Sequence, residues 1–110
     1  MIDETLGKIE ARIHSSESIS PERRDELLRL LVTLKSEVAA LHKTHDQKAR
    51  TIARFAEIST NEATRPEKDE ASLNRSLNKL NSSVEGFETS HPRLVQIVNT
   101  ISNTLSNLGI

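Results

Sequence analysis

The sequence predicts an all-α protein in which four helices form two helical hairpins, as a coiled-coil-like bundle completed by oligomerisation. Apolar residues recur at helical spacing in four segments of the chain. Between these segments lie stretches rich in serine, threonine and proline, which end one helix and begin the next. No segment has a pattern that favours a β-strand. At 110 residues the chain has the length of a single domain, residues 1–110.

The first helix is predicted over residues 2–15. Its apolar residues follow steps of four and three, which place them on one face: Ile2, Leu6, Ile9 and Ile13. A serine-rich turn follows, and then Ser20 is placed to cap a helix that begins at Pro21. Because the connection is short, the first two helices should form an antiparallel hairpin.

The second helix is predicted over residues 21–60 and is the longest. Its stripe keeps the same steps: Leu27, Leu31, Leu34, Val38, Leu41, His45, Lys48, Ile52, Phe55 and Ser59. An unbroken helix of this length would measure about 60 Å, whereas a compact domain of this size has a radius of gyration of only about 13 Å. The helix therefore either breaks near residues 42–48 or projects and needs a partner chain.

A linker at residues 60–66, closed by Pro66, joins the two hairpins. The third helix, residues 67–86, has acidic residues at its start, and its stripe is Leu73, Leu77, Leu80, Val84 and Phe87. The fourth helix, residues 92–108, begins at Pro92 with the stripe Leu94, Val98, Ile101, Leu105 and Leu108. The ending Leu108-Gly109-Ile110 predicts a C-cap in which Gly109 adopts a positive φ.

The last helix has no charged side chain after Arg93, although 28% of the chain is charged. Depletion of charge is typical of interface cores, so we expect this helix to contact an oligomer partner or a partner groove. A merely polar surface and a membrane-surface helix are the alternatives, and the lack of Lys and Arg argues against the membrane. We expect a homodimer, with an unidentified protein partner as a further possibility, and these interaction residues: Leu34, Val38, Leu41, Ile52, Phe55, Leu94, Val98, Ile101, Leu105 and Leu108.

Composition argues against several classes of function. The chain has no cysteine, only two aromatic residues and a net charge of −1, which leaves no thiolate chemistry, few stacking platforms and no global attraction for nucleic acid. No motif places a serine beside a base, so we expect no enzyme activity and no cofactor. No signal peptide or transmembrane segment is recognisable, and a cytoplasmic location is the expectation.

Two clusters in the second helix offer alternative functions. His42, His45 and Asp46 can share one helix face and could form a metal- or pH-responsive switch, although His45 could equally set register or mark a hinge. The basic residues Lys43, Lys48, Arg50 and Arg54 suggest, as a second alternative, a regulator that associates weakly with nucleic acid.

The C-terminal stretch Phe87-Glu88-Thr89-Ser90-His91-Pro92-Arg93-Leu94, continued to Gly109-Ile110, resembles the closing signature of a family of small uncharacterised bacterial proteins, a domain of unknown function. The resemblance implies a helical bacterial protein with no assigned activity. Family members are shorter, and the extra length here is expected at residues 42–70. Physically, Phe87, Glu88, His91 and Pro92 should form a structural corner: Phe87 fills it, Pro92 holds His91 at the N-cap, and Glu88 bonds the His91 ring.

Overall fold

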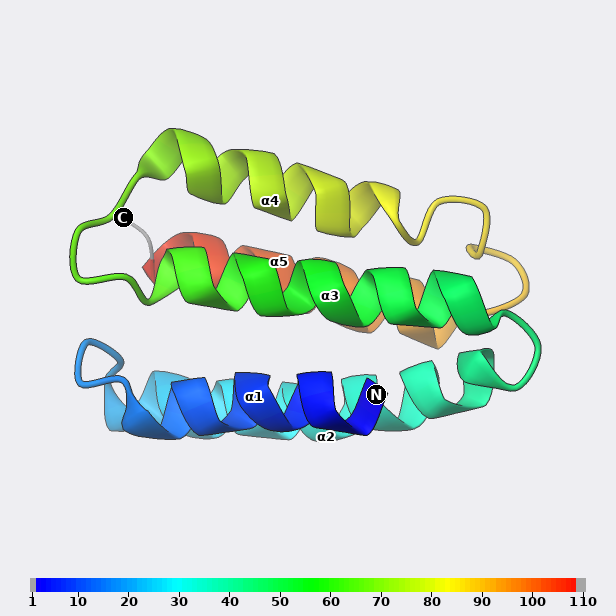
Figure 1. Ribbon diagram of the computed structural model, residues 1–110, viewed down its shortest axis with the longest axis horizontal. Helices are drawn as coiled ribbons and strands as arrows, with labels where there is room; N and C mark the ends of the chain where they lie inside the picture. Colours follow the sequence, from blue (N-terminus) through cyan, green and yellow to red (C-terminus); the bar gives the residue numbers. More distant parts are fainter. Residues whose placement is uncertain (1, 109–110) are drawn as a thin grey trace.

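The computed structural model describes residues 2–108, and this part of the chain forms five helices in which each runs antiparallel to the one before (Figure 1). They are α1 (Ile2–Ser15), α2 (Pro21–His42), α3 (Asp46–Ala63), α4 (Glu70–Ser82) and α5 (Pro92–Leu108). In Figure 1, α1 and α2 form one layer, α3 and α5 the middle layer, and α4 covers them from the other side. The molecule is all-α, as the sequence predicts, and measures 37 × 24 × 22 Å.

The prediction of a single helix over residues 21–60 is wrong, because the chain turns back after His42 and forms two helices. The backbone N–H groups of Thr44 and His45 both donate to the Leu41 carbonyl, at 3.1 and 2.8 Å, and the chain then leaves the helical path at His45 (φ −136°, ψ 65°). Folding back lets α3 pack on both α1 and α2 and keeps the radius of gyration at 12.9 Å. Of the two outcomes that the length argument allows, the break is the one that occurs.

Helix α3 is the central helix of the fold, and its buried face includes Ile52 and Ser59 of the continued stripe but not the whole stripe. It contacts the four other helices, and its buried residues are mostly small: Ala49, Ile52, Ala53, Ala56, Ser59, Thr60 and Ala63. Small side chains let several backbones approach closely around one helix. Lys48, which the stripe places inside, is exposed, and Phe55 is only partly buried.

The outer helices begin and end for local reasons. Helices α1 and α5 have the bounds expected from the sequence, and α2 begins at Pro21 with the Ser20 hydroxyl accepting the Arg23 N–H. Helix α4 is shorter than the predicted residues 67–86, because Asp69 is its N-cap and the chain turns at Gly86, where φ is +94°. The predicted cap at Gly109 lies outside the described residues.

Asp69 accepts hydrogen bonds from the backbone N–H of Ser72 at 3.2 Å and from the Ser72 hydroxyl at 2.9 Å. The backbone bond, followed by the hydroxyl bond, lowers the pKa of Asp69 below its usual value of 3.8. At the same end of the hairpin, the Lys68 ammonium donates to the Leu108 carbonyl, where the helix dipole favours a positive charge.

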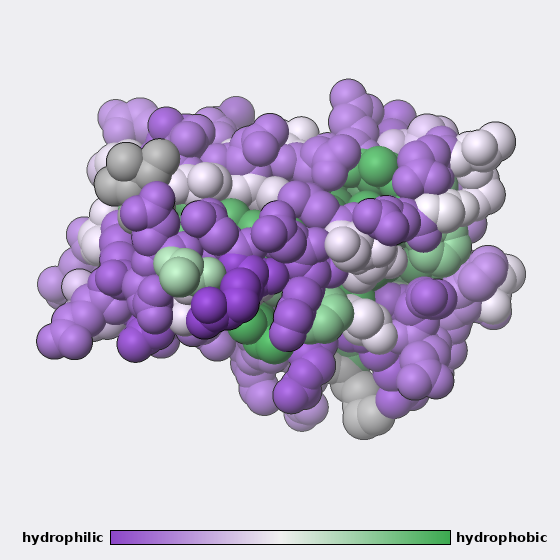
Figure 2. All heavy atoms as spheres, turned by 90° about the horizontal axis from the view of Figure 1, so that it is seen from above, coloured by the Kyte–Doolittle hydropathy of each residue, from purple (hydrophilic) through white to green (hydrophobic). Residues whose placement is uncertain are grey.

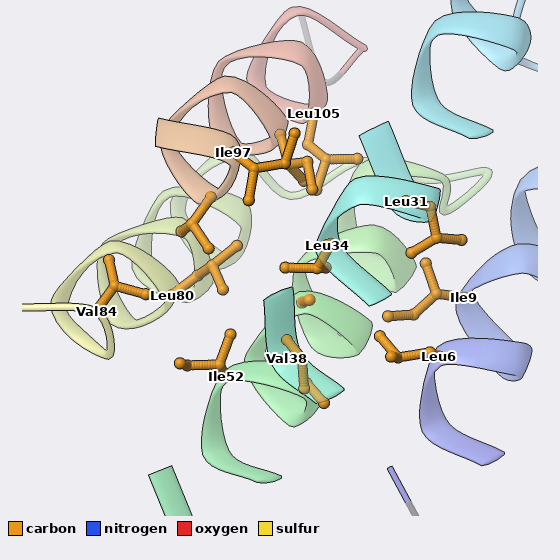
Figure 3. Packing of buried hydrophobic residues seen from close by; sticks show 14 of the residues in the cluster. Leu6, Ile9, Leu31, Leu34, Val38, Ile52, Leu80, Val84, Ile97 and Leu105 are labelled. Atoms are coloured by element: carbon orange, nitrogen blue, oxygen red, sulfur yellow. The ribbon is translucent and has the colours of Figure 1, made fainter. Parts of the chain in front are cut away.

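The surface is polar and the apolar side chains lie between the helices. On the face that α4 covers, hydrophilic residues occupy most of the surface and hydrophobic ones only small patches (Figure 2). Inside, residues from all five helices form one core, and Figure 3 shows Leu6, Leu34 and Ile52 among those that converge from α1, α2 and α3. Among the described residues, Val32 is the one exposed large hydrophobic side chain. A single chain therefore encloses its own core.

Candidate interaction surfaces

The residues predicted to contact another chain belong to this intramolecular core. Eight of them have at most 6% of their surface exposed: Leu34, Val38, Leu41, Ile52, Leu94, Val98, Ile101 and Leu105. Phe55 and Leu108 are partly buried against the same core. The apolar stripes are thus filled by neighbouring helices of one chain, and any surface for a second protein must lie on the polar outer faces.

Three aromatic rings meet where the α2–α3 turn approaches the connection between α4 and α5. Phe87, which is 8% exposed, has its ring centroid 5.4 Å from that of His45 and 5.5 Å from that of His91. The two imidazoles are 6.2 Å apart, and all three pairs are close to perpendicular. Edge-to-face packing of this kind is the favoured arrangement of aromatic pairs. The cluster joins two connections that are more than 40 residues apart in the sequence.

The corner is built from the predicted residues, but with different bonds. The Val95 N–H donates to the His91 carbonyl at 3.3 Å, so His91 lies directly before α5, as expected. The bond from the His91 ring to Glu88 is not formed. Instead Nδ1 of His91 lies 3.0 Å from the Ser90 hydroxyl, and the Glu88 carboxylate accepts the Gly86 N–H. The contact of His45 with this corner was not predicted, because the stripe placed His45 inside a continuous helix.

The three residues considered for a metal or pH switch are divided between two sites. Nδ1 of His42 lies 2.5 Å from the Asp46 carboxylate, and the same oxygen accepts Nε of Arg50 at 3.1 Å. His45 packs against Phe87 instead, with its Nδ1 2.8 Å from the Thr44 hydroxyl. Within residues 2–108, no group of three His, Cys, Asp or Glu side chains is arranged to hold a metal ion.

The predicted basic residues lie at the surface, and carboxylates lie near two of them. Lys43, Lys48, Arg50 and Arg54 are all exposed. Arg50 is paired with Asp46, and Arg54 lines a hollow together with Glu4 and Glu57. Their charge is thus partly balanced by neighbouring carboxylates.

Helices α5 and α2 lie side by side behind α1 and α3 in the view of Figure 1, and the outer surface of α5 is uncharged after Arg93. Helix α5 contacts α2, α3 and α4 with its apolar face and exposes only uncharged side chains after Arg93: Gln96, Asn99, Thr100, Asn103 and Asn107. Between Leu30 and Leu41, the exposed residues of α2 are Val32, Lys35, Ser36, Ala39 and Ala40, of which Ala39 lines a hollow with Ile2 and Asp3 of α1. We call the exposed uncharged residues of α5 the α2–α5 face, because α2 borders them.

Hydroxyl groups at the edges of α5 form hydrogen bonds with side chains of the neighbouring helices. The Thr104 hydroxyl lies 3.0 Å from the Glu26 carboxylate of α2, and the Ser102 hydroxyl donates to the Asn81 side chain of α4 at 2.9 Å. The uncharged residues of α5 are thus of two kinds: those on one side pack within the chain, and those on the other side are exposed.

These features define an all-α protein of five packed helices. The model of one protein family, described as Domain of unknown function (DUF4404), matches residues 27–110, and the chain belongs to this family. The matched range begins at residue 27 and includes residues 42–70. No curated protein and no solved structure matches the chain significantly. No helix within residues 2–108 has the length and hydropathy needed to cross a bilayer.

Proposed function

We propose that this protein is a non-catalytic helical interaction protein that self-associates through the α2–α5 face. The observation that supports the proposal is the uncharged, solvent-exposed row on α5: Gln96, Asn99, Thr100, Asn103 and Asn107. An exposed helix in a chain with 28% charged residues would ordinarily carry Lys and Glu. Loss of charge from a surface is the compositional mark of an interface core.

A second copy is the partner that this surface suits best. Most homodimers have two-fold symmetry, so a residue near the axis meets its own counterpart. A charged residue there would face a like charge, whereas the amides of Asn99 and Asn103 are both donors and acceptors and can pair with themselves. The face is therefore chemically self-complementary.

The test is the mass of the protein in solution, measured by light scattering during size-exclusion chromatography. The wild-type protein should have the mass of two chains in solution. Asn103→Lys, in the middle of the row, should shift the protein to a monomer because it brings two ammonium groups together. The matched control is Asn61→Lys, an equal change at an exposed position of α3 on another face.

Circular dichroism should show the same helix content in both variants, so that dissociation is separated from unfolding. A wild-type protein that is monomeric at all concentrations would refute self-association. A dimer that Asn61→Lys dissociates as readily as Asn103→Lys would refute the assignment to the α2–α5 face.

A further inference from the structure

A second surface, on a different side of the bundle, differs in chemistry from the α2–α5 face. Helices α3 and α4 run antiparallel beside each other and leave a hollow of about 190 Å³ between them. Its lining comes from both helices: Phe55, Ile58 and Glu62 of α3, and Ser72, Arg75, Ser76 and Lys79 of α4. Seen from above, hydrophobic surface is visible on the α3 side of α4, bordered by strongly hydrophilic side chains (Figure 2). We call this hollow the α3–α4 groove.

The floor of the groove is apolar. Phe55 is partly buried against the core, and Ile58 is half-buried. They are three residues apart on α3 and therefore lie on neighbouring turns of one helix face. An apolar floor in a groove between two helices suits the apolar stripe of a third helix, which would insert side chains at i and i+3 or i+4.

The charges around the floor are predominantly positive. Arg75 and Lys79 are exposed on α4, and neither makes an ion pair within the part of the chain that the structure describes. The single acidic residue of the lining, Glu62, is already bound by the Arg65 guanidinium at 3.0 Å. Arg75 donates to the Ser72 hydroxyl at 3.1 Å and its charge acts on Asp69, so Lys79 is the cation of the lining without a charged partner among the described residues.

We propose that the α3–α4 groove binds the apolar face of an acidic amphipathic helix of a partner protein. The partner's apolar residues would contact Phe55 and Ile58, and its carboxylates would lie beside Arg75 and Lys79. The volume is below the usual range for small-molecule sites. A nucleic-acid backbone would use the two cations but would gain nothing from the apolar floor. The groove is separate from the self-association face, so the protein would hold a second copy on one side and a partner helix on the other.

The test is a selection from a display library of amphipathic helical peptides, with random charges around a fixed apolar stripe, against the full-length protein. The selected peptides should be enriched in Asp and Glu. Their affinity, measured by fluorescence anisotropy, should fall as salt is added, because the contacts at the edge of the groove are ionic.

Three variants locate the site. Ile58→Ser and the double variant Arg75→Glu/Lys79→Glu should each weaken binding by about tenfold or more. The matched control is Lys8→Glu/Lys43→Glu, which changes the net charge equally at exposed positions outside the groove and should leave the affinity unchanged. Light scattering on each variant checks that the oligomeric state is the same, which separates this result from the test of self-association.

Three outcomes would overturn the proposal. One is a selection that yields neutral or basic peptides. Another is an acidic peptide whose affinity the groove variants and the control variant change equally. The third is a single-stranded oligonucleotide that binds in competition with the peptides and more tightly than they do, which would assign the groove to nucleic acid.

Discussion

Replacing Ser59 by alanine should stabilise the protein. Ser59 lies on α3 with 0% of its surface exposed, and its hydroxyl is the one buried side-chain oxygen in the described part of the chain without a hydrogen-bond partner. Burying an unpaired hydroxyl costs about 1–3 kcal/mol. Removing the hydroxyl should therefore raise the free energy of unfolding by most of this amount. The small void that the oxygen leaves lowers the gain slightly.

The magnitude can be isolated with a matched variant, Ser76→Ala. Ser76 is also helical and only 5% exposed, but its hydroxyl donates to the Leu73 carbonyl at 2.8 Å. Both substitutions gain the same helix propensity, about 0.5 kcal/mol. Ser76→Ala additionally loses a hydrogen bond worth about 1 kcal/mol. The two variants should therefore differ in the free energy of unfolding by about 2 kcal/mol, with Ser59→Ala the more stable.

The assay is urea unfolding followed by circular dichroism, with all proteins at one concentration because self-association would make stability depend on concentration. The midpoint of Ser59→Ala should lie above that of the wild type, and the slope should be unchanged. If Ser59→Ala is destabilised as much as Ser76→Ala, the Ser59 hydroxyl has a partner in solution and the reasoning is refuted.

Two further predictions concern the helix cap and the corner. Because the folded-state pKa of Asp69 is lowered, its carboxylate stabilises the fold above about pH 3.8, and this contribution is lost as the pH falls through the lowered pKa. Asp69→Asn should therefore melt below the wild type at neutral pH and together with it in strong acid, in thermal scans at several pH values; a constant difference would contradict the role of the charge. His91→Ala removes two ring contacts and should lower stability by about 1 kcal/mol. Thr89→Ala, at an exposed position of the same connection, is the control, and an unchanged melting temperature of His91→Ala would rule out the structural corner.

The sequence predicted the start of a helix correctly where a single residue restricts the backbone conformation. Pro21 and Pro92 mark the first residues of α2 and α5, and they do so because a missing N–H costs nothing at that position. The stripe of α2 from Leu27 to Leu41 is buried as its spacing predicts. These features depend on neighbours in sequence and need no knowledge of what packs against them.

The break after His42 could not be predicted at the right residue, because no glycine or proline stands there. Periodicity continued through it, since His45, Ile52 and Ser59 keep the steps of the stripe. The turn forms because folding back lets α3 contact four helices, a gain that appears only in three dimensions. The same holds for the alanines of α3, whose small size matters only once four backbones surround them.

The two candidate surfaces also differ in how far the sequence predicts them. The absence of charge after Arg93 is visible in the sequence and predicted contact with a partner chain, whereas the apolar face of α5 packs on α2, α3 and α4 of the same chain. The α3–α4 groove was not visible, because Ile58 and Lys79 come from helices that meet only through the fold.

The sequence by itself determined that the chain is helical and which face of most of its helices avoids water, because helix periodicity is a local property. Only the tertiary structure decided what covers those faces. Apolar stripes require burial but do not specify the covering surface, so the same pattern fits a core shared between chains and a core closed within one. In this protein the chain turns at residues 43–45 and closes the core on itself, so the stripes are covered by helices of the same chain.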